Sequence, residues 1–502
     1  MFIGFLVGCG AADTPVPTPT SPAATVAATA TVVAEATVAA EVTAVPTPSA
    51  TRTITILYTN DEHGWLEGTE SDAGAANLMG LLREREGYAP GSDVLLVSGG
   101  DMWTGPAIST WFDGESMAEV MNAMGYVAAA VGNHEFDFGL EMLQVRALQS
   151  EFPLLSANMH ALGETSLSDL GIEPYTLVEL DGLTVGIIGL TTTSTPYTTN
   201  PVNVATFEFG DYETALREVV PEVQAAGADL ILVAAHACRD EITALARRVS
   251  DLGIDLIGGG HCNELFADTI NGIVVMEGGA HLQSYARAVF AVDAAGTVMA
   301  TDYGTVSNQG GAPDANIADI VARWQEMAAA ELNVVIAYAD TAVARRSPAM
   351  QALITESWLW AYPTADVAIT NMGGMRDALP AGDITLGAVI GVMPFNNVLV
   401  DLTLTGAQLE RVLTIAQDDA IGGVSRQGGS WVLHKTGAAL DPNGTYHLLV
   451  NDFMYAGGDG FTLLAEYDPV GYNTGINWRQ PVIDWIEAQT SSAAHPLDTA
   501  IA

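Results

Sequence analysis

The feature that most constrains the fold of this chain is a series of short apolar runs that each end in glycine or polar residues. Runs of this length and composition are typical of strands buried on both faces of a sheet, and helical stretches at 117–125 and 212–227 lie between some of them. Alternating buried strands and helices predict an α/β domain, which we place at residues 51–305. The runs are ITILYTND (54–61), DVLLVSGGD (93–101), YVAAAVGNHE (126–135), FPLLSANM (152–159), TVGIIGLTT (184–192), DLILVAAH (229–236), IDLIGGGH (254–261) and GIVVMEGG (272–279).

A second folded unit follows the first. At 502 residues, of which 49% are hydrophobic, the chain is too long for a single core. The segment ANIADIVARWQEMAAAELN has apolar residues at helical spacing, so we predict a helix inside a linker at 306–333. A smaller α/β domain is then expected at 334–495.

The N-terminal fifty residues have a different composition. Residues 6–9, Leu-Val-Gly-Cys, resemble the bacterial lipobox, in which the cysteine carries the lipid, although an apolar chance sequence remains an alternative. Because the apolar stretch before Cys9 is too short for a whole signal peptide, we expect 1–9 to be a truncated signal whose true start lies upstream. Residues 10–50 are mostly Ala, Thr, Pro, Val and Ser, which predicts a disordered tether. We therefore expect an extracytoplasmic protein whose only attachment to the membrane is a lipid on Cys9.

The net charge of the chain limits the classes of molecule that can be its partners. Sixty acidic and 17 basic residues give a formal net charge of -43, and Lys435 is the only lysine. Such a surface repels polyanions, so we expect neither a nucleic-acid duplex nor an anionic membrane surface as partner. A phosphate substrate would need its charge met locally, by metal ions or by one of the few arginines. The oligomeric state stays open.

Polar residues follow the predicted strands at the points where the strands end. Because the carboxyl ends of strands in such sheets meet at one edge, these side chains are expected to face one crevice. Carboxylates, imidazoles and amide oxygens suit two divalent cations such as Zn, Mn, Fe or Co, which together activate a water and polarise a phosphoryl group. The residues are Asp61, His63, Asp101, Asn133, His134, His236, His261 and Asn263.

This ordered series resembles the motifs of the calcineurin-like metallophosphoesterases. The resemblance implies an αββα sandwich and gives one metal to Asp61, His63, Asp101 and Asn263, and the other to Asp101, Asn133, His236 and His261. Asp101 would bridge the two ions, and a metal-bound hydroxide would attack the phosphorus. His134 would be the catalytic histidine, oriented by Asp137.

The second domain resembles the C-terminal domain of the 5'-nucleotidase / UDP-sugar hydrolase family, through Asn371–Arg376, Leu404–Gly406, Asn451–Phe453 and Gly457–Phe461. The resemblance implies that Arg376 binds phosphate with help from Asn371, with Arg346 as a weaker candidate. Phe453 would stack on the base and Asp459 would bind the ribose. It also implies a rotation between the domains. In the segment 394–399, the position that we assign to a second stacking ring is Leu399, which predicts weakened base recognition.

We therefore expect a dinuclear 5'-nucleotidase that releases phosphate from nucleoside monophosphates. Alternatives are a 2',3'-cyclic nucleotide phosphodiesterase, a UDP-sugar or dinucleotide pyrophosphohydrolase, a sulfur-ester hydrolase, and a nucleotide-binding lipoprotein without turnover. Cys238 and Cys262 are open to three interpretations: soft ligands, a disulfide, or buried inert thiols, of which we favour the last. The remaining histidines, interpreted as structural, are His160, His281, His434, His447 and His495.

Overall fold

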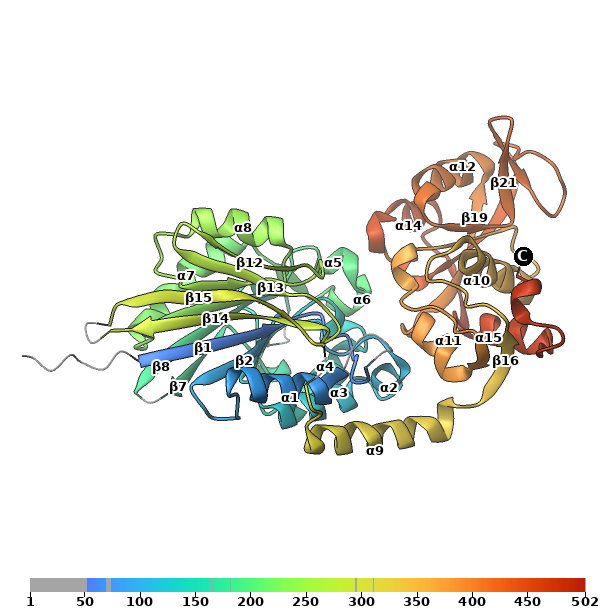
Figure 1. Ribbon diagram of the computed structural model, residues 1–502. Helices are drawn as coiled ribbons and strands as arrows, with labels where there is room; N and C mark the ends of the chain where they lie inside the picture. The colour runs from blue at the N-terminus through green and yellow to red at the C-terminus, as the bar shows by residue number, and fades with distance from the viewer. Residues whose placement is uncertain are drawn as a thin grey trace, which may run out of the picture. The chain divides into compact units, whose positions relative to one another are not determined.

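The computed structural model describes residues 52–68, 74–163, 166–180, 182–293, 296–309 and 311–501 (Figure 1). The predicted lipobox with Cys9 and the predicted tether at 10–50 lie outside these residues. Within the described ranges, none of the helices combines the length and the apolar character that crossing a bilayer requires.

Two sheets form the N-terminal part of the described chain. The first has the strand order β15-β14-β1-β2-β3-β4-β6, and β1 to β4 run parallel to one another. Its strands are β1 (Arg52–Thr59), β2 (Val94–Ser98), β3 (Ala128–Ala130), β4 (Leu154–Leu155), β6 (Ile172–Glu173), β14 (Ser284–Val292) and β15 (Val298–Ser307). The second sheet has the strand order β12-β13-β11-β10-β8-β7, in which the neighbouring strands β13, β11, β10 and β8 run parallel. Its strands are β7 (Tyr175–Leu180), β8 (Leu183–Leu190), β10 (Leu230–Ala235), β11 (Leu256–Gly258), β12 (Leu265–Ile270) and β13 (Ile273–Gly278).

The two sheets pack face to face, and helices cover their outer faces. Ile56 and Val97 of the first sheet share a buried cluster with Ile187 and Leu232 of the second. A second cluster joins the first sheet to α1 (Gly74–Glu86), α3 (Glu115–Met124) and α4 (Gly139–Gln149), and a third joins the second sheet to α7 (Tyr212–Ala225) and α8 (Arg239–Arg248). The predicted αββα sandwich is therefore confirmed.

Short elements complete this part. They are α2 (Ala107–Thr110), η1 (His134–Phe136), β5 (Met159–Ala161), η2 (Ser168–Leu170), α5 (Thr195–Thr198), α6 (Pro201–Val204) and β9 (Phe207–Phe209). Because β1, β2 and β3 are parallel neighbours, the loops that follow them emerge at the same edge. The loop after β10 meets them there, since His236 Nδ1 lies 2.8 Å from the carbonyl oxygen of Gly99.

The predicted linking helix is α9 (Ala315–Leu332), which begins where the Asp314 side chain accepts hydrogen bonds from the backbone N–H groups of Asn316 and Ile317. Beyond it lies a five-stranded sheet, counted over the described residues, of order β20-β17-β23-β19-β24. The domain boundaries themselves stay predictions. The elements are β16 (Val335–Ala339), α10 (Pro348–Ala361), β17 (Val367–Thr370), η3 (Met372–Gly374), β18 (Gly382–Thr385), α11 (Leu386–Val392), β19 (Val398–Thr405), α12 (Gly406–Ile415), η4 (Ala416–Asp418), β20 (Ala420–Gly422), β21 (Val424–Gln427), β22 (Ser430–Leu433), β23 (Thr445–Asn451), α13 (Asp452–Tyr455), η5 (Gly458–Gly460), α14 (Leu463–Tyr467), β24 (Tyr472–Asn477), α15 (Gln480–Ala488) and η6 (Leu497–Thr499).

Candidate metal centre and active site

The loops that carry the predicted ligands have an unusual backbone conformation. Five of these residues adopt a positive φ, which costs a non-glycine residue on the order of 1 to 3 kcal/mol unless its surroundings impose it. Interlocking backbone bonds do so here, because the N–H of Asp61 donates to the Gly100 carbonyl and that of His63 to the Asp101 carbonyl, both at 2.9 Å. The five are Asp61 (51°), His63 (47°), Asp101 (59°), His261 (72°) and Asn263 (59°). Backbone strain that is concentrated on the polar residues at one edge of the sheets indicates a functional site.

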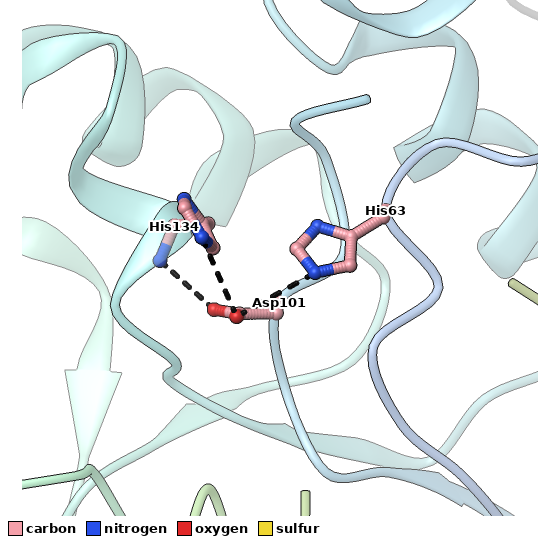
Figure 2. Close-up of side chains that lie close together, drawn as sticks. All are labelled: His63, Asp101 and His134. Atoms are coloured by element: carbon pink, nitrogen blue, oxygen red, sulfur yellow. Dashed lines mark hydrogen bonds and ion pairs between the residues drawn. The ribbon is translucent and has the colours of Figure 1, made fainter. Parts of the chain in front are cut away.

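Asp101 lies at the centre of the cluster, with only 2% of its surface exposed. Its Oδ2 is 3.8 Å from His63 Nε2 and 4.0 Å from His134 Nε2, and these three side chains form one potential metal-binding group (Figure 2). Burial alone would raise the pKa of this carboxyl, but His236, His134 and His63 hold the pKa well below its usual value. Asp101 is therefore an anion that faces several imidazoles.

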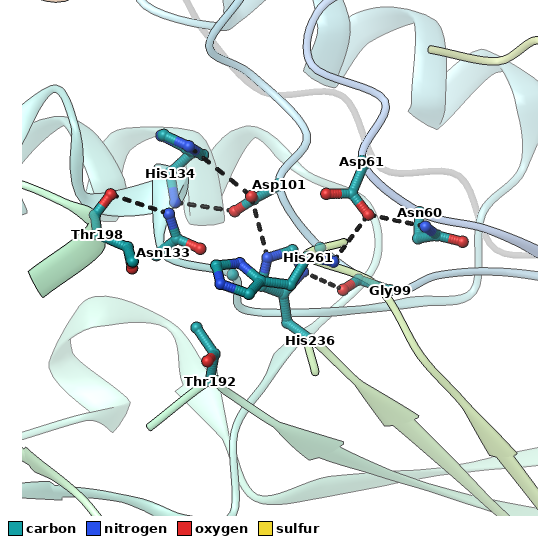
Figure 3. A network of polar contacts seen from close by, with 12 residues as sticks. Asn60, Asp61, Gly99, Asp101, Asn133, His134, Thr192, Thr198, His236 and His261 are labelled. Atoms are coloured by element: carbon teal, nitrogen blue, oxygen red, sulfur yellow. Dashed lines mark hydrogen bonds and ion pairs between the residues drawn. The ribbon is translucent and has the colours of Figure 1, made fainter. Parts of the chain in front are cut away.

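A second potential group consists of Asp101, His236 and His261 (Figure 3). Asp101 Oδ2 is 3.0 Å from His236 Nε2, and the Asp61 carboxylate accepts a hydrogen bond from the His261 backbone N–H at 2.9 Å. Burial lowers the pKa of His261 to about 4, so its ring is neutral and able to bind a cation. Because Asp101 belongs to both groups, it is the only described residue in a position to bridge them.

Backbone carbonyls orient two of the imidazoles. His63 Nδ1 lies 2.9 Å from the Thr104 carbonyl oxygen, and His236 Nδ1 lies 2.8 Å from that of Gly99. A carbonyl oxygen only accepts hydrogen bonds, so in each ring Nδ1 carries the proton and directs Nε2 into the site. This is the arrangement that metal-binding histidines require.

The donor atoms fit divalent metal ions. Two buried oxygen atoms of the cluster, Asp61 Oδ1 and Asn133 Oδ1, have no hydrogen-bond partner in the described part of the chain. Unsatisfied buried acceptors of this kind are costly unless a ligand completes them. Nitrogen and oxygen donors with no thiolate suit Zn, Mn, Fe or Co. Asn263 lines the cavity beside His63 and Asp101.

His134, a member of the first potential metal-binding group, forms a hydrogen-bonded pair with Asp137. His134 Nδ1 lies 2.7 Å from Asp137 Oδ2. Burial alone would lower the pKa of His134, but Asp137 and Asp101 outweigh this effect and raise the pKa above its usual value. With Nδ1 bound to Asp137, Nε2 of a protonated ring is free to donate into the cavity.

Sequence reasoning assigned no role to Glu135, although it follows His134 directly. Its buried carboxylate accepts hydrogen bonds from the backbone N–H groups of Asp101, Met102 and Gly132, at 2.9, 2.7 and 2.6 Å. Burial and the nearby Asp101 charge raise the pKa of Glu135 to about 7. Glu135 therefore ties the loop after β2 to the loop after β3. The only signal in the sequence was an acidic residue in an otherwise buried motif.

Most of the predicted substrate-binding residues share the cavity with members of the potential metal-binding groups, namely His63, Asp101, His134 and His261. Asn371, Arg376, Phe453 and Asp459 line it, and Arg376 Nη2 lies 3.3 Å from His63 Nε2. Arg346 does not line this cavity, since its guanidinium donates to the Met372 carbonyl at 2.9 Å on the exposed side.

The interpretation of Leu399 is wrong. Leu399 is fully buried in the core of the C-terminal part, whereas its neighbour Val400, on the opposite face of β19, lines the cavity. A ring at position 399 would therefore face away from a ligand. Phe395 is one of the aromatic residues that line the cavity together with Phe453, and it stacks on His134 with 5.7 Å between ring centroids.

Cys238 and Cys262 form a disulfide, so the favoured interpretation as inert thiols is wrong. The bond joins the segment after His236 to the segment after His261. It thus connects the two loops that carry these imidazoles.

Gly132 packs too closely against Asp101 to tolerate a side chain. A Cβ at this position would lie 2.2 Å from Asp101 Oδ1 and 2.7 Å from its backbone nitrogen. We expect Gly132→Ala to lower the free energy of unfolding by about 1 to 3 kcal/mol and to lower activity sharply, because Asp101 must move. Denaturant titration and an ester-hydrolysis assay would measure both effects. Gly304→Ala, where the added Cβ meets no atom within 4 Å, is the control; equal behaviour of the two variants would contradict the prediction.

Comparisons with known proteins agree with this geometry. Residues 314–466 match the family model of the 5'-nucleotidase C-terminal domain. The chain is 28% identical to protein UshA of Yersinia enterocolitica over 89% of its length and 92% of the relative, and 27% identical to a 5'-nucleotidase of Vibrio cholerae over 88% and 91%. Among solved structures, a 5'-nucleotidase precursor from Thermus thermophilus matches with a TM-score of 0.75 and 27% identity, over 88% of this chain and 97% of that one.

Proposed function

The chain belongs to the 5'-nucleotidase family of hydrolases, and we propose that it releases phosphate from nucleoside 5'-monophosphates outside the cytoplasm. The observation that carries the proposal is a single cavity of about 1080 Å³. Its walls combine the proposed metal-binding residues His63 and Asp101 with Arg376, Phe453 and Asp459. A site that can hold metal ions thus adjoins side chains suited to a phosphate, a base and a ribose.

Two divalent ions are proposed to bind at this site. One ion would be held by Asp61, His63, Asp101 and Asn263, and the other by Asp101, Asn133, His236 and His261. Bound there, the ions would polarise the phosphoryl oxygens and promote ionisation of the attacking water.

Side chains of the protein would bind the phosphate and protonate the leaving group. The Arg376 guanidinium, next to His63, would hold the phosphate and offset the strongly negative charge of the chain. His134 would donate the proton on Nε2 to the oxygen of the departing nucleoside, while Asp137 holds the ring through Nδ1.

Nucleoside recognition would fall to Phe453, Phe395 and Asp459. Both rings line the cavity, and stacking on an aromatic ring is worth about 1 to 3 kcal/mol per base. Asp459 Oδ2 accepts a hydrogen bond from Asn371 at 2.7 Å, which leaves its other oxygen to accept from ribose hydroxyls. Arg346 lies outside the cavity lining, so we propose for it at most an electrostatic contribution.

A second candidate is favoured by the size of the cavity. Its volume of about 1080 Å³ slightly exceeds the usual range for ligand sites, which leaves room for a UDP-sugar or a dinucleotide. We therefore propose pyrophosphate-bond hydrolysis of such compounds as a second activity of the same site.

A substrate panel tests the function. We expect purified protein with Mn or Zn to hydrolyse AMP fastest, followed by UDP-glucose, with 2',3'-cyclic AMP and a non-nucleotide ester well behind. Preference for the non-nucleotide ester would contradict the nucleotidase proposal. If none of these compounds is hydrolysed but AMP binds, the protein is a binding protein instead.

Metal removal gives a second test. Treatment with a chelator is expected to abolish hydrolysis and to lower the melting temperature, since ions that bind only the folded state stabilise it. Adding back Mn, Zn or Co singly should restore both, and metal analysis would give the stoichiometry. Full activity after demonstrated removal of the ions would contradict a metal-dependent mechanism.

The proposed location rests on the N-terminal sequence and on the disulfide. Disulfides persist mainly in oxidising compartments, and Cys238 is joined to Cys262. Lipidation of Cys9 is proposed from the lipobox-like sequence alone. Mass spectrometry of the mature N-terminus tests it: a lipid-modified cysteine would support the anchor, and an unmodified Met1 would overturn it.

A further inference from the structure

A polar segment between β8 and β9, residues 192–203, borders the active site. We call it the strap; it contains α5 and α6. The Thr198 carbonyl accepts a hydrogen bond from Asn133 Nδ2 at 3.1 Å, as Figure 3 shows, and Ser194 Oγ lies 3.3 Å from His261 Nε2. The strap therefore contacts two of the proposed metal-binding residues without supplying a ligand itself.

Thr199 of the strap lines the cavity next to the His134–Asp137 pair and contacts Asp137. Its hydroxyl donates to Asp137 Oδ1 at 2.9 Å, while Asp137 Oδ2 faces His134 Nδ1 at 2.7 Å. Only 2% of Thr199 is exposed, and the Asp137 side chain is 6% exposed, so water does not readily replace this contact. Each carboxylate oxygen of Asp137 thus has its own partner.

These contacts restrict the rotation of the Asp137 carboxylate. If the group turned to present another oxygen to His134, the buried hydroxyl bond to Thr199 would break. The strap holds Thr199 in place through Asn203, whose side chain donates to the Phe136 carbonyl at 2.8 Å, one residue before Asp137.

We propose that Thr199 is a positioning residue, which orients His134 for proton donation by fixing Asp137. The inference rests on the proposed function, since it concerns the same reaction. It assigns a role in turnover to a residue of the strap that is not among the proposed ligands of the phosphate or of the ions.

Thr199→Val tests this role, because it keeps the shape of the side chain and removes the hydroxyl. We expect kcat to fall about tenfold or more, as for other groups that orient active-site residues, with KM within about twofold of the wild type. Thr199→Ser should restore kcat to within about threefold. Thr214→Val is the control, since the Thr214 hydroxyl also donates to an aspartate at 2.9 Å, but on an exposed helix start. An unchanged kcat in Thr199→Val, or a Thr199→Ser variant as slow as Thr199→Val, would overturn the proposal.

A double variant distinguishes a positioning role of Thr199 from a general loss of activity. Because Thr199 acts only through the pair, Thr199→Val should cause no further loss in a His134→Ala background. A further loss of about tenfold there would overturn the inference. The assays use whichever ester of the panel the wild type hydrolyses best. Inactive wild-type protein would refute the proposed function, whereas active wild type with an unaffected Thr199→Val would refute only the role of Thr199.

Discussion

Replacing Asp101 with asparagine is expected to lower ester hydrolysis by about a thousandfold or more. Asp101 is the residue that both potential metal-binding groups share, and stabilisation of the transition state by the ions is worth several kcal/mol. An amide removes the negative charge that three surrounding imidazoles face. We also expect the variant to lose most of the rise in melting temperature that added Mn or Zn gives the wild type.

Asp229→Asn is the matched control for this experiment. The Asp229 carboxylate accepts from the Thr184 backbone N–H at 2.9 Å, at the opposite end of β10 from His236, and an amide oxygen can take over that role. The control should retain activity and its response to metal ions. If Asp101→Asn keeps a tenth of the wild-type rate, Asp101 does not bridge catalytic ions.

Arg376→Met is expected to lower kcat/KM for AMP by about a hundredfold, or about 3 kcal/mol, the value of charge-assisted hydrogen bonds to a phosphate. Arg376→Lys should recover only part of the loss, because an ammonium cannot form the paired hydrogen bonds of a guanidinium. Steady-state kinetics with AMP measure both variants.

Arg426→Met is the control for the loss of an arginine. The Arg426 guanidinium lies 5.8 Å from the Trp431 ring centroid, much as that of Arg376 lies 5.7 Å from Phe395, but on the exposed β21–β22 hairpin. Its replacement should leave kcat/KM unchanged. An equal loss in both variants would show that the effect of Arg376 is not due to phosphate binding.

The fold was predictable because its strands leave a strong signal. Buried parallel strands appear in the sequence as continuous apolar runs, which predict the α/β class. Each run ends where polar residues begin, so the position of Asp61, Asp101 and His236 at one edge could also be predicted. The helix α9 was also predictable, because its apolar residues recur at helical spacing. The resemblance to known motifs supplied the order of the ligands.

Side-chain direction and long-range contacts were not predictable in the same way. Leu399 was misplaced because successive residues of a strand face opposite sides, and the start of β19 at Val398 decides which one meets the cavity. The Glu135 carboxylate accepts hydrogen bonds from backbone N–H groups, and the sequence does not show which backbone groups a side chain binds. Thr199 lies 62 residues from Asp137, and only the folded chain brings them together.

The positive φ angles of the proposed ligands also limit how this centre can be redesigned. Aspartate, asparagine and histidine tolerate the left-handed region better than other non-glycine residues, and they are the types found at positions 61, 63, 101, 261 and 263. Each position thus suits both the conformation of the backbone and the proposed binding of metal ions. Libraries that exchange these residues for glutamate, glutamine or cysteine would lose folded protein before they changed metal preference. Variation of the surrounding shell, such as Thr104 or Ser194, is the more productive route to altered metal selectivity.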